Sequence, residues 1–160
     1  MKTRLIKPND NSILAEIIRG NLKAHKLDVP GTVYFDSNLD HLSDFYLANP
    51  SKQTYFVALD DDENVIGGIG LAPADYFDDC AELQKLYLSS SAQGNGLSYK
   101  LIVLIEEKAI QLGYKRLYLE THTNLAAAIH IYEKCGYKLI DRPESVVHSG
   151  MNRFYLKELF

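Results

Sequence analysis

Residues 82–101 read Glu82-Leu-Gln-Lys-Leu-Tyr-Leu-Ser-Ser-Ser-Ala-Gln-Gly-Asn-Gly-Leu-Ser-Tyr-Lys-Leu101, and this stretch decides the expected fold. Its first part carries Leu83, Leu86 and Leu88 among polar residues, a pattern that favours a β-strand. A small polar loop follows. Beyond it, apolar residues recur every three to four positions, as they do along a helix. The stretch therefore predicts a strand, a glycine turn and a helix.

The turn Gln93-Gly94-Asn95-Gly96 is predicted to bind phosphate. Its glycines leave several backbone N–H groups without a Cβ in front of them. These groups lie at the beginning of a helix, where the peptide dipoles leave partial positive charge. A turn of this kind binds anions. The alternative is an ordinary strand-to-helix turn without a ligand.

Two other nucleotide-binding turns do not fit the spacing. The dinucleotide fingerprint requires glycines at its first, third and sixth positions, but Tyr99 occupies the sixth position after Gly94 and Gly96. A Walker loop requires Gly, four residues and then Gly-Lys-Ser/Thr, and the sequence contains no such run. What remains resembles the pyrophosphate loop of the GNAT superfamily of acetyl-CoA-dependent N-acetyltransferases.

In that family the loop reads Gln or Arg, two residues, Gly, one residue, then Gly or Ala. The residues that carry the resemblance here are Gln93, Gly94, Asn95, Gly96, Leu97 and Ser98. Ser98 departs from the small apolar residue at the last position, although it is still small. We expect all six residues to bind the cofactor.

A second segment resembles the other half of the GNAT cofactor site. Asn124 opens a predicted helix over residues 124–136, Tyr132 follows eight residues later, and Glu133-Lys-Cys-Gly-Tyr137 ends the segment. The resemblance implies an α/β (α+β) fold over one domain, residues 1–160. That fold has a single mixed, mostly antiparallel sheet with helices on both faces and a splayed strand pair that binds acetyl-CoA.

The other elements are expected in the order that this resemblance requires. A helix should carry Ile13, Leu14, Ile17, Ile18 and Leu22 on one face, with Asn9, Asp10 or Asn11 as its cap. A second helix should carry Leu39, Leu42, Phe45 and Tyr46, and a third should end at Gly113. Strands are expected at residues 3–7, 53–59, 65–71, 116–121, 137–140 and 152–159.

The composition is that of one ordinary water-soluble domain. Of the 160 residues, 46% are hydrophobic and 24% charged, and the net charge of −4 disfavours a nucleic-acid-binding protein. Cys80 and Cys135 lie far apart, and no His or Cys cluster has zinc spacing, so we expect a reducing compartment and no metal. Residues 1–8 do not resemble a signal peptide, and no long apolar run suggests a membrane span. We expect a cytoplasmic protein, monomeric or homodimeric.

The acceptor is expected to be a small-molecule or peptide amine. In proteins that this sequence resembles, the region between the first two helices walls the acceptor site, which places Tyr34 and Phe35 there. Tyr76, in the predicted loop 72–80, is a third candidate. These aromatic residues and the acidic charge balance favour a cationic or aromatic acceptor. Ordinary packing of Tyr34 and Phe35 is the open alternative.

The chemistry expected from the resemblance is direct acetyl transfer through a tetrahedral intermediate. Leu86, Tyr87 and Leu88 are predicted to contact the cofactor: the backbone of this segment would pair with the pantetheine arm, and the N–H of Leu88 or a neighbour would face the thioester oxygen. Asn124 would contact the pantetheine amides, unless it only caps its helix.

Tyr132 is the candidate general acid, because its hydroxyl can protonate the departing thiolate. The alternative is a core aromatic residue, since Leu125, Ile129 and Tyr132 share a helical face. Glu82 is the candidate base, acting directly or through water. It precedes Gln93 by eleven residues, as a glutamate base does in histone acetyltransferases of the superfamily. A surface position for Glu82 is the alternative, and an acyl-CoA-binding module without turnover is the alternative to an enzyme.

Overall fold

The fold is built on one mixed sheet. A computed structural model describes residues 1–146 and 149–160, and within these ranges seven strands form a sheet in the order β1-β2-β3-β4-β5-β7-β6. Only the β4–β5 pair is parallel. The strands are β1 (Lys2–Leu5), β2 (Thr54–Leu59), β3 (Val65–Pro73), β4 (Cys80–Leu88), β5 (Arg116–Thr121), β6 (Lys138–Ile140) and β7 (Arg153–Glu158).

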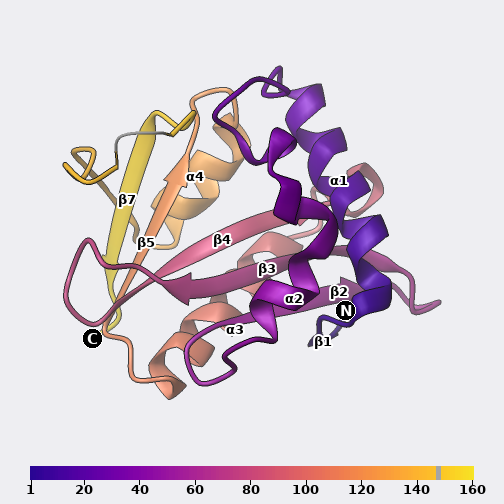
Figure 1. Ribbon diagram of the computed structural model, residues 1–160, viewed down its shortest axis with the longest axis horizontal. Coiled ribbons are helices and arrows are strands. Elements are labelled where there is room, and N and C mark those ends of the chain that lie inside the picture. The colour runs from indigo at the N-terminus through magenta and orange to yellow at the C-terminus, as the bar shows by residue number, and fades with distance from the viewer. Residues whose placement is uncertain (147–148) are drawn as a thin grey trace.

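Helices cover both faces of this sheet, as the resemblance implies. In Figure 1, α1 and α2 lie in front of the sheet, and α3 and α4 lie behind it. The helices are α1 (Asn11–Ala24), α2 (Leu42–Tyr46), α3 (Leu97–Gln111) and α4 (Ala126–Lys134), with 3-10 turns at Pro8–Asp10, Val33–Phe35, Ser37–His41 and Ser90–Ala92. None of these helices is both long and apolar enough to cross a bilayer, among the residues described.

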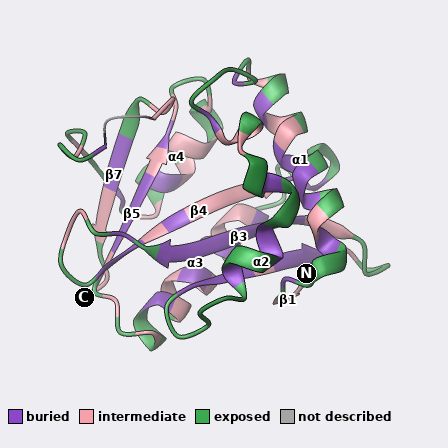
Figure 2. Ribbon diagram, in the orientation of Figure 1, coloured by how far each residue is buried: buried purple, intermediate pink, exposed green. Residues whose placement is uncertain are grey.

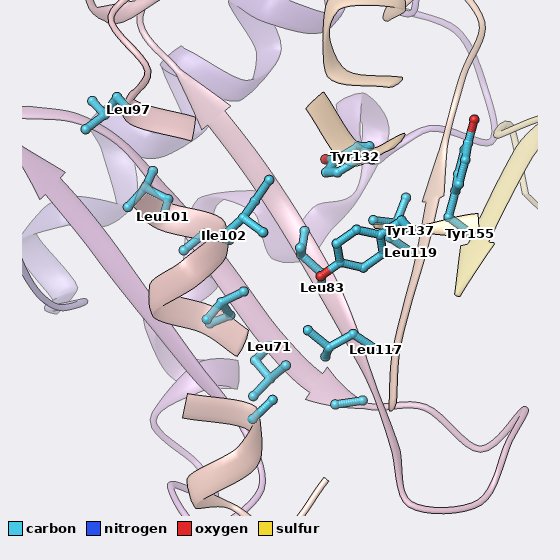
Figure 3. Packing of buried hydrophobic residues seen from close by; sticks show 14 of the residues in the cluster. Leu71, Leu83, Leu97, Leu101, Ile102, Leu117, Leu119, Tyr132, Tyr137 and Tyr155 are labelled. Carbon is cyan, nitrogen blue, oxygen red and sulfur yellow. The ribbon is translucent and has the colours of Figure 1, made fainter. Parts of the chain in front are cut away.

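Alternating side chains of the strands divide the core between the two faces. Tyr55, Val57 and Leu59 of β2 pack with α1 and α2, whereas Ala58 joins the cluster beneath α3 and α4. Figure 2 shows β3 mostly buried, β4 divided between buried and intermediate residues, and the outer sides of the helices exposed. Figure 3 shows the second cluster, in which side chains of α3 and α4 meet those of the strands. Each helix layer therefore fixes one side of the sheet.

Several local expectations are corrected by the structure. The second helix is a 3-10 turn followed by the five-residue α2, and Phe45 is exposed while Tyr46 is buried. Ile13 is also exposed, at the edge of the apolar face of α1. Asp10 precedes α1, but its carboxylate does not cap that helix: it accepts the Lys7 N–H at 2.8 Å and binds the Arg4 guanidinium at 2.7 Å. These contacts replace the expected side-chain cap of α1.

Gly70 of β3 leaves room for two tyrosine rings. A Cβ built at Gly70 would lie 2.8 Å from the Tyr46 hydroxyl oxygen and 2.8 Å from Cδ2 of Tyr55. Both rings are buried, so neither can move aside without disturbing the core. We expect Gly70→Ala to lower the free energy of unfolding by about 1–3 kcal/mol in urea titrations.

The matched control is Gly20→Ala, which makes the same change inside α1. No atom lies within 4 Å of a Cβ built at Gly20. This variant should be more stable than the wild type by up to about 1 kcal/mol, because alanine favours a helix. Equal stability of the Gly70→Ala and Gly20→Ala variants would contradict the close packing described at Gly70.

Candidate active site

Strands β4 and β5 run side by side for only part of their length. Their pairing covers Cys80–Glu82 and Arg116–Tyr118, and beyond this segment the strands diverge (Figure 1). A bulge interrupts the pairing of β4 with β3, and Lys85 within it has a left-handed backbone with φ 49°. The Tyr55 hydroxyl donates a hydrogen bond of 2.9 Å to the Lys85 carbonyl and holds the bulge in place. The predicted splayed strand pair is therefore present.

The backbone of Leu88 faces the opening between the two strands. Leu88 pairs with Gly67, and the next residue, Ser89, donates its N–H to the Ile66 carbonyl at 2.8 Å. Bonded and non-bonded pairs alternate along an antiparallel ladder, so the N–H and C=O of Leu88 point away from β3. The Leu88 carbonyl accepts from the Asn21 side chain at 2.8 Å. The Leu88 N–H therefore points toward the space where β5 has diverged.

The loop between β4 and α3 presents backbone amides at a helix N-terminus. Gly94 and Gly96 have left-handed backbones, with φ 84° and 71°, and no atom lies within 4 Å of a Cβ built at either position. The loop is therefore open in front of these glycines. The Gln93 side chain donates to Asn21 Oδ1 and to the Leu88 carbonyl, both at 3.1 Å. Gln93 thus fastens the loop to α1 and β4, and the amides that begin the 15-residue α3 remain available to an anion.

A cavity of about 210 Å³ occupies the splay. Of the residues predicted to bind the cofactor, those that line it are Leu86, Tyr87, Leu88, Gln93, Gly94, Ser98 and Tyr132. Asn95 and Gly96 belong to the exposed loop at its edge, and the Leu97 side chain is buried in the core. The cavity thus brings Gln93, Gly94 and Ser98 of the glycine loop together with Tyr132 of the second motif. Asn21 and His25, at the C-terminal end of α1, also line it, and no sequence pattern pointed to them.

Tyr132 belongs to the core and also lines this cavity. In Figure 3 its ring lies above the labelled side chains of Leu83, Leu119 and Tyr137. Its ring centroid is 6.0 Å from that of Tyr137. Among the described residues, no protein group hydrogen-bonds the Tyr132 hydroxyl, and no side-chain N or O is both buried and unpaired. The hydroxyl is therefore accessible from the cavity. Burial raises the pKa of Tyr132 above its usual value and keeps the phenol protonated at neutral pH.

Asn124 lies outside the cavity lining. Its side chain is exposed and donates a hydrogen bond of 3.0 Å to the His25 carbonyl at the end of α1. The helix begins at Ala126 with Leu125 as its N-cap, so the alternative in which Asn124 only caps its helix is wrong. Asn124 instead ties the segment before α4 to α1.

A second, more open cavity of about 630 Å³ adjoins the first. Three carboxylate residues, Asp36, Glu82 and Glu120, line it together with Lys85. Both cavities share the lining residues Leu83, Lys85, Tyr87, Glu120 and Met151. The shared wall means that a molecule in one cavity can approach a molecule in the other. The surplus of carboxylates gives the second cavity a negative charge.

Glu82 is partly buried and faces this second cavity. Burial raises the pKa of its carboxyl to about 7, and Glu120 acts in the same direction, while the Gln84 hydrogen bond and Lys85 act against it. Burial lowers the pKa of Lys85, although Asp36 and Glu82 oppose this change. A carboxyl that titrates near neutral pH can accept a proton from an acceptor in the cavity.

The predicted acceptor residues divide between two locations. Tyr76 lines the second cavity and packs edge-on against Tyr118, with ring centroids 5.0 Å apart. Tyr34 and Phe35 do not line it: Tyr34 packs beside the α1 cluster and Phe35 is 62% exposed. Their segment reaches the cavity through Thr32, Val33 and Asp36 instead.

Three comparisons with known proteins agree with this architecture. The sequence model of the Acetyltransferase (GNAT) family matches residues 21–137. The chain is 36% identical over 140 residues to the uncharacterized N-acetyltransferase YjgM of Escherichia coli K12, covering 86% of this chain and 82% of that protein.

Solved structures share the whole fold at low sequence identity. An acetyltransferase of the GNAT family from Staphylococcus aureus Mu50 superposes with a TM-score of 0.85 at 20% identity, covering 99% of both chains. YncA of Salmonella typhimurium, solved with acetyl-CoA, gives a TM-score of 0.76 at 19% identity, covering 100% of this chain and 94% of that one. The matched residues include β4, the glycine loop and α4. The chain belongs to the GNAT acetyltransferase family.

Proposed function

We propose that this protein transfers an acetyl group from acetyl-CoA directly to the amine of a small molecule or peptide. The observation that carries the proposal is the Leu88 N–H, which points into the splay next to the open glycine loop. Acetyl-CoA would supply an acetyl group activated as a thioester. A backbone donor placed at the developing oxyanion typically contributes about 3 kcal/mol to acyl transfer.

The residues present fit the two ends of acetyl-CoA. The amides around Gly94 and Gly96 would bind its pyrophosphate at the N-terminus of α3, where no side chain blocks the approach. The unpaired edge of β4 near Leu88 would bind the amides of the pantetheine arm. Tyr132 would donate its hydroxyl proton to the leaving sulfur, and Glu82 would take a proton from the acceptor amine.

The second cavity supports a cationic or aromatic acceptor. Asp36 and Glu120 would attract a positively charged group elsewhere on the acceptor, and Tyr76 offers a ring against which it could pack. An acceptor of this kind would place its reacting amine near Glu82 at the wall shared by the two cavities. Turnover of neutral hydroxyl acceptors alone would contradict this part of the proposal.

Calorimetric titration of acetyl-CoA tests the phosphate-binding loop. Gly94→Glu places a carboxylate where the pyrophosphate would lie, and Gly94→Gln has the same shape and the same left-handed backbone without the charge. We expect Gly94→Glu to bind at least about tenfold more weakly than Gly94→Gln, because a like charge at close range repels phosphate. Equal affinities of these two variants would place the phosphates elsewhere.

Release of coenzyme A in the presence of a panel of amines tests the reaction. Release that depends on a particular amine, with an acetylated product of matching mass, would support acetyl transfer. Tight binding without release for any amine would instead support the alternative of an acyl-CoA-binding module. Absence of binding to the wild-type protein would overturn both.

A further inference from the structure

A chain of two hydrogen bonds leads from the core to Glu82. The Tyr46 hydroxyl, on α2, donates to Gln84 Oε1 at 2.7 Å. Gln84 Nε2 in turn donates to Glu82 Oε1 at 3.1 Å. Tyr46 is 1% exposed, so the first member of the chain is fixed by packing. Gln84 and Glu82 lie two residues apart on β4, and their side chains therefore share one face of the strand.

The chemistry of the three groups sets the direction of this chain. An ionised carboxylate only accepts hydrogen bonds, so Gln84 must turn its NH₂ group toward Glu82. Its carbonyl oxygen then faces Tyr46, which has one O–H to donate. The tyrosine hydroxyl therefore holds the amide in the orientation that suits the ionised form of Glu82. Gly70 allows this arrangement, since a Cβ there would lie 2.8 Å from the Tyr46 hydroxyl oxygen.

We propose that Gln84, held in one orientation by Tyr46, positions the Glu82 carboxylate for proton transfer from the acceptor amine. This inference rests on the proposed function, in which Glu82 is the base. Gln84 and Tyr46 are positioning residues, because they act on the acceptor only through Glu82. Among the described residues, Glu82 accepts a side-chain hydrogen bond through Oε1, and its Oε2 is left for the acceptor or for a bridging water.

Several other groups act on the same carboxyl group. Lys85 on β4 favours its ionised form, whereas Glu120 on β5 favours its neutral form. Within residues 1–146 and 149–160, its titratable surroundings also include the Cys80 thiol on β4, the hydroxyls of Tyr46, Tyr76 and Tyr118, and the carboxylate of Asp36. Glu120 is itself bound by the Tyr118 hydroxyl at 3.0 Å and by the Ser149 hydroxyl at 2.8 Å. The Gln84 amide donates directly to the Glu82 carboxylate, and this hydrogen bond lowers the pKa of that carboxyl.

The test is the pH dependence of kcat/KM in two variants of similar shape. Gln84→Met removes the donor, and Tyr46→Phe removes the hydroxyl that orients it. Each should raise the pKa of Glu82 and so shift the acid limb of the profile to higher pH by about one unit, because each removes stabilisation from the ionised carboxylate. The double variant should move no further than Gln84→Met, because both substitutions break the same chain.

The control is Tyr155→Phe. The Tyr155 hydroxyl donates to the Glu133 carboxylate at 3.1 Å, outside both cavities, so this variant removes a comparable bond without touching the chain. Its acid limb should coincide with that of the wild type. An acid limb that stays in place in Gln84→Met or in Tyr46→Phe overturns the inference. So does a double variant whose displacement equals the sum of the single ones.

NMR titration of the Glu82 carboxyl carbon separates this inference from the proposed function. The signal is identified by its loss in Glu82→Gln, and its titration requires no turnover. Suppose that the pKa of Glu82 rises in Gln84→Met and in Tyr46→Phe, but that the activity of Glu82→Gln has the same pH profile as the wild type. This pair of results would support the hydrogen-bond chain and reject Glu82 as the base. Unchanged titration in both variants would reject the chain, whatever the activity.

Discussion

Glu82→Gln is expected to lower kcat/KM for the acceptor amine by about 100- to 10,000-fold at pH 8, the range that general base catalysis usually contributes. Glutamine preserves the shape of the side chain and can still accept the hydrogen bond from Gln84 Nε2. It cannot take a proton from the amine. Initial rates of coenzyme A release, measured from pH 6 to pH 9, provide the comparison.

The pH dependence follows from the raised pKa of Glu82, which is about 7. A base must be ionised to act, so wild-type activity should rise as the pH passes about 7, and this limb should be missing from the Glu82→Gln profile. The matched control is Glu120→Gln, which removes a neighbouring carboxylate that raises the pKa of Glu82. Its acid limb should persist and move to lower pH. An unchanged profile in Glu82→Gln would remove this residue from the mechanism.

The same substitution should stabilise the fold at alkaline pH. The pKa of Glu82 is raised from 4.5 to about 7 on folding, so the folded state binds the proton more tightly and its stability declines as the pH rises between these values. Glutamine carries no charge to bury. Glu82→Gln should therefore unfold with a free energy about 2–3 kcal/mol higher at pH 8, and show no such gain near pH 4. Denaturant titrations at both pH values would also confirm that lost activity is not lost structure.

Local sequence patterns predicted the parts of the fold that local interactions determine. The strand Arg116–Thr121 has the expected bounds, and α3 begins where the glycine turn ends. The spacing of apolar residues predicts the strand, and the glycines with left-handed backbones mark the start of the helix. The resemblance added the sheet order and the splay, which no single segment encodes. Helix α4 begins at Ala126, later than expected, because the segment before it folds against α1.

Contacts between distant segments account for what the sequence could not reveal. Gln93 lines the predicted cofactor cavity, and its side chain is bound to Asn21, 72 positions earlier, a contact that no sequence pattern predicted. Lys85 reaches both cavities because of a bulge that the Tyr55 hydroxyl stabilises across the sheet. The acidic character of the second cavity arises from Asp36 and Glu120, which lie in unrelated segments. The only sequence signal for the Gln84–Glu82 pair was their two-residue spacing on a strand.

Tyr132→Phe is expected to reduce kcat by about 100-fold or more while leaving the affinity for acetyl-CoA nearly unchanged. The substitution removes one oxygen and keeps the ring that packs in the core. Since no protein group in the described residues binds this hydroxyl, its loss breaks no hydrogen bond of the fold. Thermal unfolding should therefore be close to that of the wild type. Steady-state rates and calorimetric affinity, measured on the same preparations, separate the two quantities.

Tyr137→Phe provides the matched control, because the two rings are neighbours but their hydroxyls have different surroundings. The Tyr137 hydroxyl donates to the Glu106 carboxylate at 3.0 Å, and neither residue lines the cavity. Its removal should cost about 1 kcal/mol of stability and leave kcat within about twofold of the wild type. Tyr132→Phe should thus lose activity and keep its stability, whereas Tyr137→Phe should lose stability and keep its activity. Equal rates in both would mean that Tyr132 serves the core alone, and that the thiolate receives its proton from water or from Tyr87, which lines the same cavity.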